Sequence, residues 1–424
     1  MTNTSNTDAS GKQIVIARNA IAQLVGLIGI VLLQAIYAVL GARILGVEDF
    51  GKLAFIVAIS QFFVIAGDMG LNNTILRRIS AGPQLSSMLF PPFFSLRLIL
   101  SGLLFVIFMS TTLYLESPGE RAMPLLFGFG MFFHSTNSSL NVVFQAHGKL
   151  YLASLNNFLI TFFQVILGVL FLLNGGQLPS LGIAYLISNL LALATNYVLF
   201  TRSIHSLELR PPSGWKTLLR ESLPVGLGAL FQVASSRFPI AILTLLSGSH
   251  QTGLFSAAHR ITLVLSNVPA AILSAFLPAM ASLQGDSKSV RQLLVLASFL
   301  MLILALPFSL FMGSLAPFTI SLLFGPAYLP AAEVLSVLSW ALTPLFLGKA
   351  FEHVLLSQTN LIRFHPVVSA IILVVNGMFC LLLIPSMGAQ GAATATLVTE
   401  GVLALLYFLA TFSFLFGRSH RKSY

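Results

Sequence analysis

Seven charged side chains lie well inside long apolar stretches of this 424-residue chain, in which only 8% of the residues are charged, and Glu333 lies near the boundary of another. The seven are four cations and three acids: Arg97, Arg237, Arg260, Lys349, Asp68, Glu352 and Glu400. A charge in the middle of an apolar helix costs about 2.5 to 3.5 kcal/mol on insertion scales, so such residues pair with one another or face a water-filled cavity. Guanidinium groups bind phosphate and carboxylate oxygens bidentately. The excess of cations therefore favours an anionic ligand.

Arg237 and Arg260 lie in consecutive apolar segments, at predicted depths of roughly 14 Å and 9 Å from the same membrane face. Glu400 has a comparable depth in the last segment. Two interpretations stay open. Either an arginine pairs with Glu400 and joins two helices, or one or both arginines line a cavity and contact a pyrophosphate or an acidic sugar. The sequence SGSHQTG between the two segments is expected to be a hydrated turn with no further role.

Arg97 and Lys349 lie about seven or eight residues from the predicted cytoplasmic ends of their helices, so each is either an interfacial anchor or a cavity cation. Lys349 and Glu352 are three residues apart on one helical face, and a local ion pair is the simplest account of them. Asp68 is expected either to pair with Arg97 or Arg18 or to carry a coupling proton.

A run of small polar residues surrounds His134 in another apolar segment, and Asn137 and Asn141 belong to it. Such a wall of hydrogen-bonding groups suits a sugar. It also suits contact between helices, because small polar residues commonly join helices in membranes. Both interpretations stay open.

The elements that must position these residues are membrane-spanning helices. Hydrophobic residues make up 56% of the chain and the mean hydropathy is +0.92, which excludes a water-soluble globule. Apolar runs of roughly 20 residues, enough to cross about 30 Å of hydrocarbon, predict an all-α polytopic membrane protein with about twelve spans. The expected spans are residues 17–41, 53–76, 89–113, 122–146, 151–173, 181–201, 222–246, 254–281, 291–313, 331–356, 364–385 and 391–416.

The orientation follows from the lysine and arginine residues between the spans. With both termini cytoplasmic, the outer turns hold only Arg43, Lys52 and Arg121. The inner segments then hold Lys12, Arg18, Arg77, Arg78, Lys149, Arg202, Arg210, Lys216, Arg220, Lys288, Arg291, Arg363, Arg418, Arg421 and Lys422. This asymmetry explains the net charge of +10 without a nucleic-acid partner.

The chain is predicted to be a duplication. An ungapped shift of 202 residues pairs Arg18 with Arg220, Gly26 with Gly228, Gly46 with Gly248 and Gly51 with Gly253. An even number of spans in each copy gives two six-helix lobes in the same orientation. We expect an N-terminal lobe over residues 1–205, a cytoplasmic linker over 206–220 and a C-terminal lobe over 221–424.

Several short sequences resemble one known family. They are ARILGVEDFGKLAF (42–55), GDMGLNNTILRRIS (67–80), SLPVGL (222–227), GLFSAAHRI (253–261), FLPAMASL (276–283) and LLFGPAYLPAAEVL (322–335). Together they resemble the O-antigen and polysaccharide flippases of the Wzx type, in the multidrug, oligosaccharidyl-lipid and polysaccharide (MOP) exporter superfamily.

The resemblance implies a MATE-like fold, with two six-helix lobes around a central cavity, in the bacterial inner membrane. It further implies a flippase that moves an undecaprenyl-pyrophosphate-linked oligosaccharide to the periplasmic leaflet by alternating access. The implied partners are this substrate, the lipid bilayer and polysaccharide assembly proteins.

Motifs for ATP, metal or nucleophilic chemistry are absent from the sequence, and its single cysteine, Cys380, excludes an intramolecular disulfide, so neither an enzyme nor a cofactor is predicted. The main alternative is a cation-coupled multidrug exporter of the same superfamily, in which carboxylates should dominate the cavity. A membrane-embedded polysaccharide polymerase or ligase is disfavoured, because the longest outer connection, residues 314–330, carries no charge. A scaffold for glycan-assembly enzymes is a further alternative.

Overall fold

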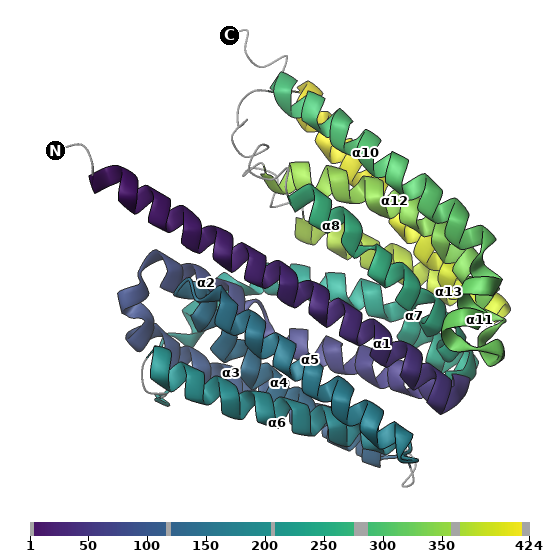
Figure 1. Cartoon of the computed structure of the whole chain (residues 1–424), viewed down its shortest axis with the longest axis horizontal. Helices are drawn as coiled ribbons and strands as arrows, with labels where there is room; N and C mark the ends of the chain where they lie inside the picture. Colours follow the sequence, from purple (N-terminus) through teal and green to yellow (C-terminus); the bar gives the residue numbers. More distant parts are fainter. Residues whose placement is uncertain (1–3, 116–119, 205–207, 275–286, 358–364, 418–424) are drawn as a thin grey trace. The chain divides into compact units, whose positions relative to one another are not determined.

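The computed structural model describes residues 4–115, 120–204, 208–274, 287–357 and 365–417. Within these ranges the chain is helical with short connections and no β-strand, which confirms the predicted all-α fold (Figure 1). The sequence FLPAMASL, the end of the predicted eighth span and the start of the predicted linker lie outside the described residues. Eight described helical stretches are long and apolar enough to cross a membrane, and the number of twelve spans stays a prediction.

Three of these stretches are broken by a single glycine. The breaks are at Gly46 in α1 (Thr4–Asp68), Gly248 in α7 (Trp215–Leu265) and Gly388 in α13 (His365–Gly417). Gly46 has φ 77° and ψ 176°, and Gly248 has φ 81° and ψ 174°, a conformation that is nearly restricted to glycine. Each break lies where the sequence predicts a connection between two spans. The two glycines matched by the 202-residue shift therefore have the same backbone conformation.

Two predicted boundaries need correction. The expected span 53–76 is not continuous, because Met69 (φ 46°) and Gly70 (φ 76°) are left-handed and separate α1 from α2 (Leu71–Ala81). The expected outer connection 314–330 contains the helix α11 (Ala316–Phe324) and the 3-10 turn η2 (Pro326–Tyr328). Both begin with a proline in the first turn, where the missing N–H has no intrahelical partner to lose.

The chain divides into two compact units, of which the first is Met1–Gly41 with Ser60–Leu230. Besides parts of α1 and α7, it contains α2, η1 (Pro83–Leu85), α3 (Ser86–Leu115), α4 (Ala122–Ala146), α5 (Leu150–Leu173) and α6 (Leu178–Ser203). Helix α4 packs against α3 and α6, and α5 also packs against α6. An aromatic core joins α3 to α6, where the rings of Phe90 and Phe200 are 5.1 Å apart.

The second unit is Ala42–Ile59 with Phe231–Tyr424. It contains the rest of α1 and α7, α8 (Asn267–Ser274), α10 (Ser287–Ser314), α11, η2, α12 (Ala331–Ser357) and α13. Helix α12 packs against both α10 and α13. Small residues of α10, such as Ala297 and Ala305, allow close packing in the same apolar cluster as Leu342 and Phe346 of α12.

Each unit contains a segment of the other predicted lobe. Residues 42–59 belong to the second unit, and residues 221–230 belong to the first. The division into lobes at residues 205–221 describes the sequence repeat and stays a prediction.

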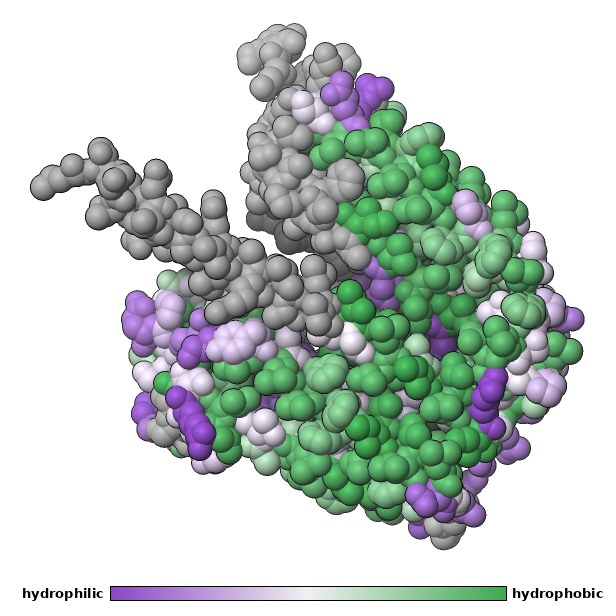
Figure 2. Space-filling model, viewed as in Figure 1, coloured by the Kyte–Doolittle hydropathy of each residue, from purple (hydrophilic) through white to green (hydrophobic). Residues whose placement is uncertain are grey.

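The surface has the character of a membrane protein. Figure 2 shows apolar side chains over the long helices, with hydrophilic residues gathered mainly near helix ends. On α10, Phe299 is 61% exposed and Phe311 is 58% exposed. Water-soluble monomers rarely expose such continuous apolar surface, so the chain is a multi-pass membrane protein.

The stretch SGSHQTG has structural roles, so the expectation that it has no further role is wrong. Apart from Gly248 it is helical, and Thr252 Oγ1 lies 2.9 Å from Thr244 Oγ1. Gln251 Oε1 accepts a hydrogen bond of 3.1 Å from the N–H of Ala389, directly after the Gly388 break. The first N–H groups of a helical segment have no partner within the segment, and this glutamine supplies one.

Gly248→Ala should destabilise the protein, because alanine in the Gly248 conformation is strained by roughly 1 to 3 kcal/mol. Gly401→Ala is the matched control: its backbone is helical and a Cβ there has nothing within 4 Å. Thermal unfolding of the purified protein in detergent should show a lower Tm for Gly248→Ala alone. Equal Tm values for the two variants would contradict this account of the break.

Candidate functional site

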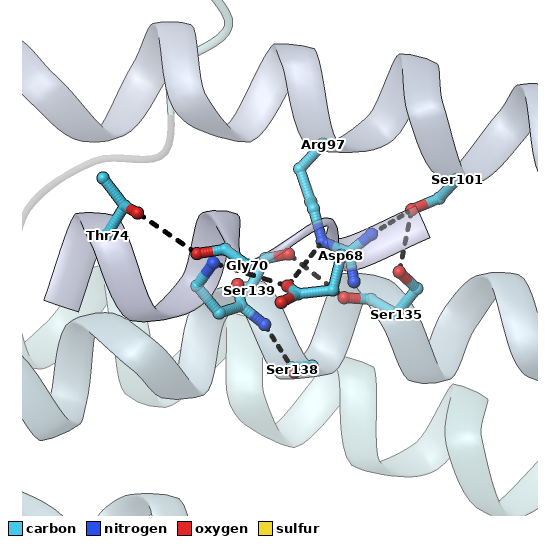
Figure 3. A network of polar contacts seen from close by, with 9 residues as sticks. Asp68, Gly70, Thr74, Arg97, Ser101, Ser135, Ser138 and Ser139 are labelled. Carbon is cyan, nitrogen blue, oxygen red and sulfur yellow. Dashed lines mark hydrogen bonds and ion pairs between the residues drawn. The ribbon is translucent and has the colours of Figure 1, made fainter. Parts of the chain in front are cut away.

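A buried ion pair joins α1 to α3 in the first unit (Figure 3). Arg97 Nε lies 3.5 Å from Asp68 Oδ1, and the Arg97 side chain is only 2% exposed. Arg97 Nη1 donates to Ser101 Oγ at 3.1 Å, and the hydroxyls of Ser101 and Ser135 are 2.7 Å apart. The guanidinium is therefore held by a carboxylate and a chain of hydroxyls that reaches α4.

The helix break at Met69 and Gly70 positions this pair. Asp68 is the last residue of α1, and its Oδ1 accepts a hydrogen bond of 3.4 Å from the N–H of Asn72 in the first turn of α2. The neighbouring Gly67 leaves room for Arg97, because a Cβ there would lie 3.2 Å from Arg97 Nη1. The structure thus brings Asp68 to Arg97, and the side chain of Arg18, the other partner considered, lies outside the described part.

The predicted polar wall lies between helices. Asn196 of α6 donates to the carbonyl oxygen of Asn137 at 3.2 Å and to Asn141 Oδ1 at 3.2 Å. Asn137 Nδ2 donates to the carbonyl oxygen of Asn189 at 3.0 Å, and His134 Nδ1 lies 3.2 Å from Asn189 Oδ1. Asn137, Asn189 and Asn196 are fully buried. Of the two interpretations, this geometry corresponds to contact between α4 and α6.

Lys349 and Glu352 form a second ion pair, on α12 of the second unit. Lys349 Nζ lies 2.7 Å from Glu352 Oε2, as their spacing predicts. Glu400 of α13 lies near enough for the charges of both residues to act on it, and Glu352 and Glu400 in turn act on Tyr407. The structure therefore brings Glu400 near the Lys349 pair, and the charge that acts on Arg237 is that of Arg260.

Arg237 and Arg260 form a cationic cluster in the second unit. Arg237 lies eleven residues before the Gly248 break and Arg260 twelve residues after it, and the two charges repel each other. His259 lies within the field of both arginines, and its ring stacks on Phe255 with 5.4 Å between centroids. His259 was not predicted to belong to this cluster, although its position next to Arg260 in an apolar segment indicates it.

The membrane-embedded cations differ in how they are neutralised. Arg97 and Lys349 each have a carboxylate partner. Within the described part of the chain, Arg237 forms no ion pair or hydrogen bond, and the charge that acts on it is that of Arg260. Two neighbouring guanidinium groups suit an anionic ligand that bridges them. Among the described residues, no group of three or more His, Cys, Asp or Glu side chains could hold a metal ion.

The fold resembles those of solved transporters. An inward-facing MATE family multidrug resistance transporter of the MOP superfamily is 17% identical, with a TM-score of 0.75 over 95% of this chain and 100% of its own. The lipid II flippase MurJ, in an inward closed conformation, is 14% identical, with a TM-score of 0.77 over 93% of this chain and 87% of its own. A MOP superfamily transporter from Pyrococcus furiosus, described as having a binding pocket of reverse polarity, is 18% identical with a TM-score of 0.61, covering 95% of each chain.

These structures define the class: the chain has the fold of the MOP superfamily transporters. The model of the family of polysaccharide biosynthesis proteins matches residues 16–284, and the chain belongs to this family. Among curated proteins, none matches the chain.

Arg97→Leu should lower the free energy of unfolding by roughly 3 to 5 kcal/mol, because it leaves the Asp68 carboxylate buried without its cation. Adding Asp68→Asn should restore most of this loss. Thermal or denaturant unfolding of the single and double variants measures the coupling between the two residues.

The exposed pair Arg78–Glu221 is the matched control. Its atoms are 2.6 Å apart, but its side chains are 36% and 46% exposed, so breaking it should cost at most about 1 kcal/mol. A similar small loss for Arg97→Leu would show that the buried pair contributes little to folding.

Proposed function

We propose that this protein is a flippase for a lipid-linked oligosaccharide with an anionic headgroup, such as an undecaprenyl-pyrophosphate-linked repeat unit of O-antigen, capsule or exopolysaccharide. The substrate moves from the cytoplasmic to the periplasmic leaflet of the bacterial inner membrane. The two predicted lobes alternate in access, both termini are cytoplasmic, and polysaccharide assembly proteins are the partners that supply and receive the substrate.

The arginine cluster of the second unit carries this proposal. Arg237 and Arg260 bring two positive charges together inside apolar segments, and Arg237 forms no ion pair with a described residue, so an anion beside it is stabilised. A diphosphate offers several oxygens to two guanidinium groups at once, and each charge-assisted hydrogen bond is stronger than a neutral one. The polyprenyl tail needs no protein site, because it can stay in the lipid.

The comparisons support the same class of substrate. The matching family is that of polysaccharide biosynthesis proteins, and one structural relative is a flippase for lipid II. We assign the main contact with the headgroup to Arg237 and Arg260, whose predicted depth in the outer half of the membrane suits a headgroup late in its crossing. Arg97 and Lys349 contribute less to binding of the headgroup, since a carboxylate already pairs with each of them.

A cation-coupled multidrug exporter is the second candidate, and the similarity to MATE transporters favours it. Such a protein needs acids that are available to a cationic substrate. Asp68 and Glu352 are each within ion-pair distance of a cation, and the charge of Lys349 also acts on Glu400. The distribution of charge therefore favours an anionic substrate.

Arg237→Ala should reduce flipping of a fluorescent polyprenyl-diphosphate oligosaccharide by roughly 10- to 100-fold in vesicles that contain the purified protein, because one or two charge-assisted hydrogen bonds are lost. Arg237→Lys should retain an intermediate rate, since lysine keeps the charge but not the planar fork. Arg77→Ala is the control: Arg77 is exposed on α2 and its loss should leave the rate unchanged.

Two results would count against this function. An unchanged rate in Arg237→Ala would remove the arginine cluster from the site. Transport of a cationic dye together with no flipping of the diphosphate lipid would favour the multidrug exporter.

A further inference from the structure

Two backbone segments of the second unit touch at a pair of glycines. A Cβ on Gly51 would overlap the carbonyl oxygen of Ser249 and lie 2.8 Å from the nitrogen of Gly253. A Cβ on Gly253 would overlap the carbonyl oxygen of Val47 and lie 3.0 Å from a Val47 side-chain carbon. Neither position can accept a side chain unless the segments separate. Small residues permit this close approach between membrane helices.

The contact is reciprocal under the sequence repeat. The shift of 202 residues carries Val47 to Ser249 and Gly51 to Gly253, so the contact of Gly51 with Ser249 becomes the contact of Gly253 with Val47. A contact that maps onto itself in this way is the signature of a two-fold axis between like segments. Both segments begin directly after glycine breaks of the same conformation. The duplicated halves therefore meet here through equivalent surfaces.

Polar contacts hold the first of these segments in the second unit. Arg43 donates to the carbonyl oxygens of Leu322 and Leu323 at the end of α11, the latter at 2.7 Å. Tyr328 Oη donates to the carbonyl oxygen of Ala42 at 3.0 Å. Carbonyl groups at a helix end have no intrahelical partner, and Arg43 supplies the missing hydrogen-bond donors. The lysine and arginine distribution predicts that this end of the helices faces the outside.

The first unit contains a second glycine contact, on the predicted inner side. A Cβ on Gly70 would lie 2.5 Å from the carbonyl oxygen of Ser222 and 2.6 Å from the nitrogen of Gly226. A Cβ on Gly226 would overlap the backbone of Met69. This contact has no counterpart under the 202-residue shift, since neither position 272 nor position 24 is a glycine.

We propose that the reciprocal contact of Gly51 with Gly253 is the outer closure of the transport pathway, and that residues 42–59 leave the second unit when this closure opens. The proposal rests on the proposed function, in that the chain transports something, and on the predicted orientation, in which this end of the helices faces the outside. Backbones in contact leave no space for a headgroup. The closure separates once the polar contacts of Arg43 and Tyr328 and the packing of buried side chains such as Val47 and Phe50 are released.

Spin labels at Glu48→Cys and His250→Cys test the proposal in a Cys380→Ala background. These two positions are exposed and equivalent under the repeat, and each lies beside the contact. In the otherwise unchanged protein, the label distance should show mainly one short population. Gly51→Ala and Gly253→Ala should each raise the long-distance population by about tenfold or more, because overpacking disfavours the closed state.

Gly41→Ala is the matched control on the same helix, since a Cβ there has nothing within 4 Å. It should leave the label distances unchanged. A distance distribution that is identical in Gly51→Ala, Gly253→Ala and Gly41→Ala would overturn the proposal. Size-exclusion chromatography identifies a variant that does not fold. If one of Gly51→Ala and Gly253→Ala fails in this way, the other provides the test.

A second experiment needs no glycine substitution. A short reducible cross-link between the cysteines at positions 48 and 250 should stop flipping of the diphosphate lipid, and reduction should restore it. Undiminished flipping with the cross-link complete would overturn the closure. If no variant flips this lipid, the proposed function fails, while the spin-label distances still decide whether the closure exists.

Discussion

Polar groups inside hydrocarbon must find partners within the protein, and the arrangement of this chain depends on that constraint. The Asp68 carboxylate at the end of α1 fixes the guanidinium of Arg97 on α3. The amide of Asn196 likewise fixes α6 against α4, through hydrogen bonds to Asn137. Helices in a membrane gain little from apolar burial, since lipid is as apolar as their own side chains. The polar pairs therefore select which helices become neighbours.

Close contact between backbones is a second way in which helical segments associate. Where a polar pair is missing, glycine allows two segments to gain dispersion energy by close approach, as at Gly51 and Gly253. Such a contact has a different mechanical character from the pair of Asp68 and Arg97. A buried ion pair is costly to separate because each charge loses its partner. Separating a glycine contact loses only packing energy. Two segments therefore separate at a lower cost in free energy where they meet through glycines than where a buried ion pair joins them.

The sequence predicts those structural features that depend on the spacing of residues close together in the chain. The pair of Lys349 and Glu352 follows from three residues on one helix, and the helix break at Gly248 follows from a turn signal between two apolar runs. Distance along a helix gives the depth of a residue but not the direction in which it points. For that reason Glu400 could be placed at the level of the arginines, whereas its position beside Lys349 depends on how α13 packs on α12. The break at Met69 and Gly70 was missed because methionine carries no turn signal and a single glycine is tolerated inside an apolar helix.

The arginine cluster and the glycine contact share one element, and this links binding to closure. Gly248 separates the segment that carries Arg237 from the segment that carries Arg260, and Gly253 lies in the second of these. Without an anion, repulsion between the two arginines acts to spread the segments apart. An anion held by both removes this repulsion and favours the arrangement in which the segments lie together. A ligand can shift a conformational equilibrium only if it binds one conformation more tightly than the other. On the proposed function, the headgroup does so at the Gly248 break, and the Gly253 contact lies in the segment that follows this break.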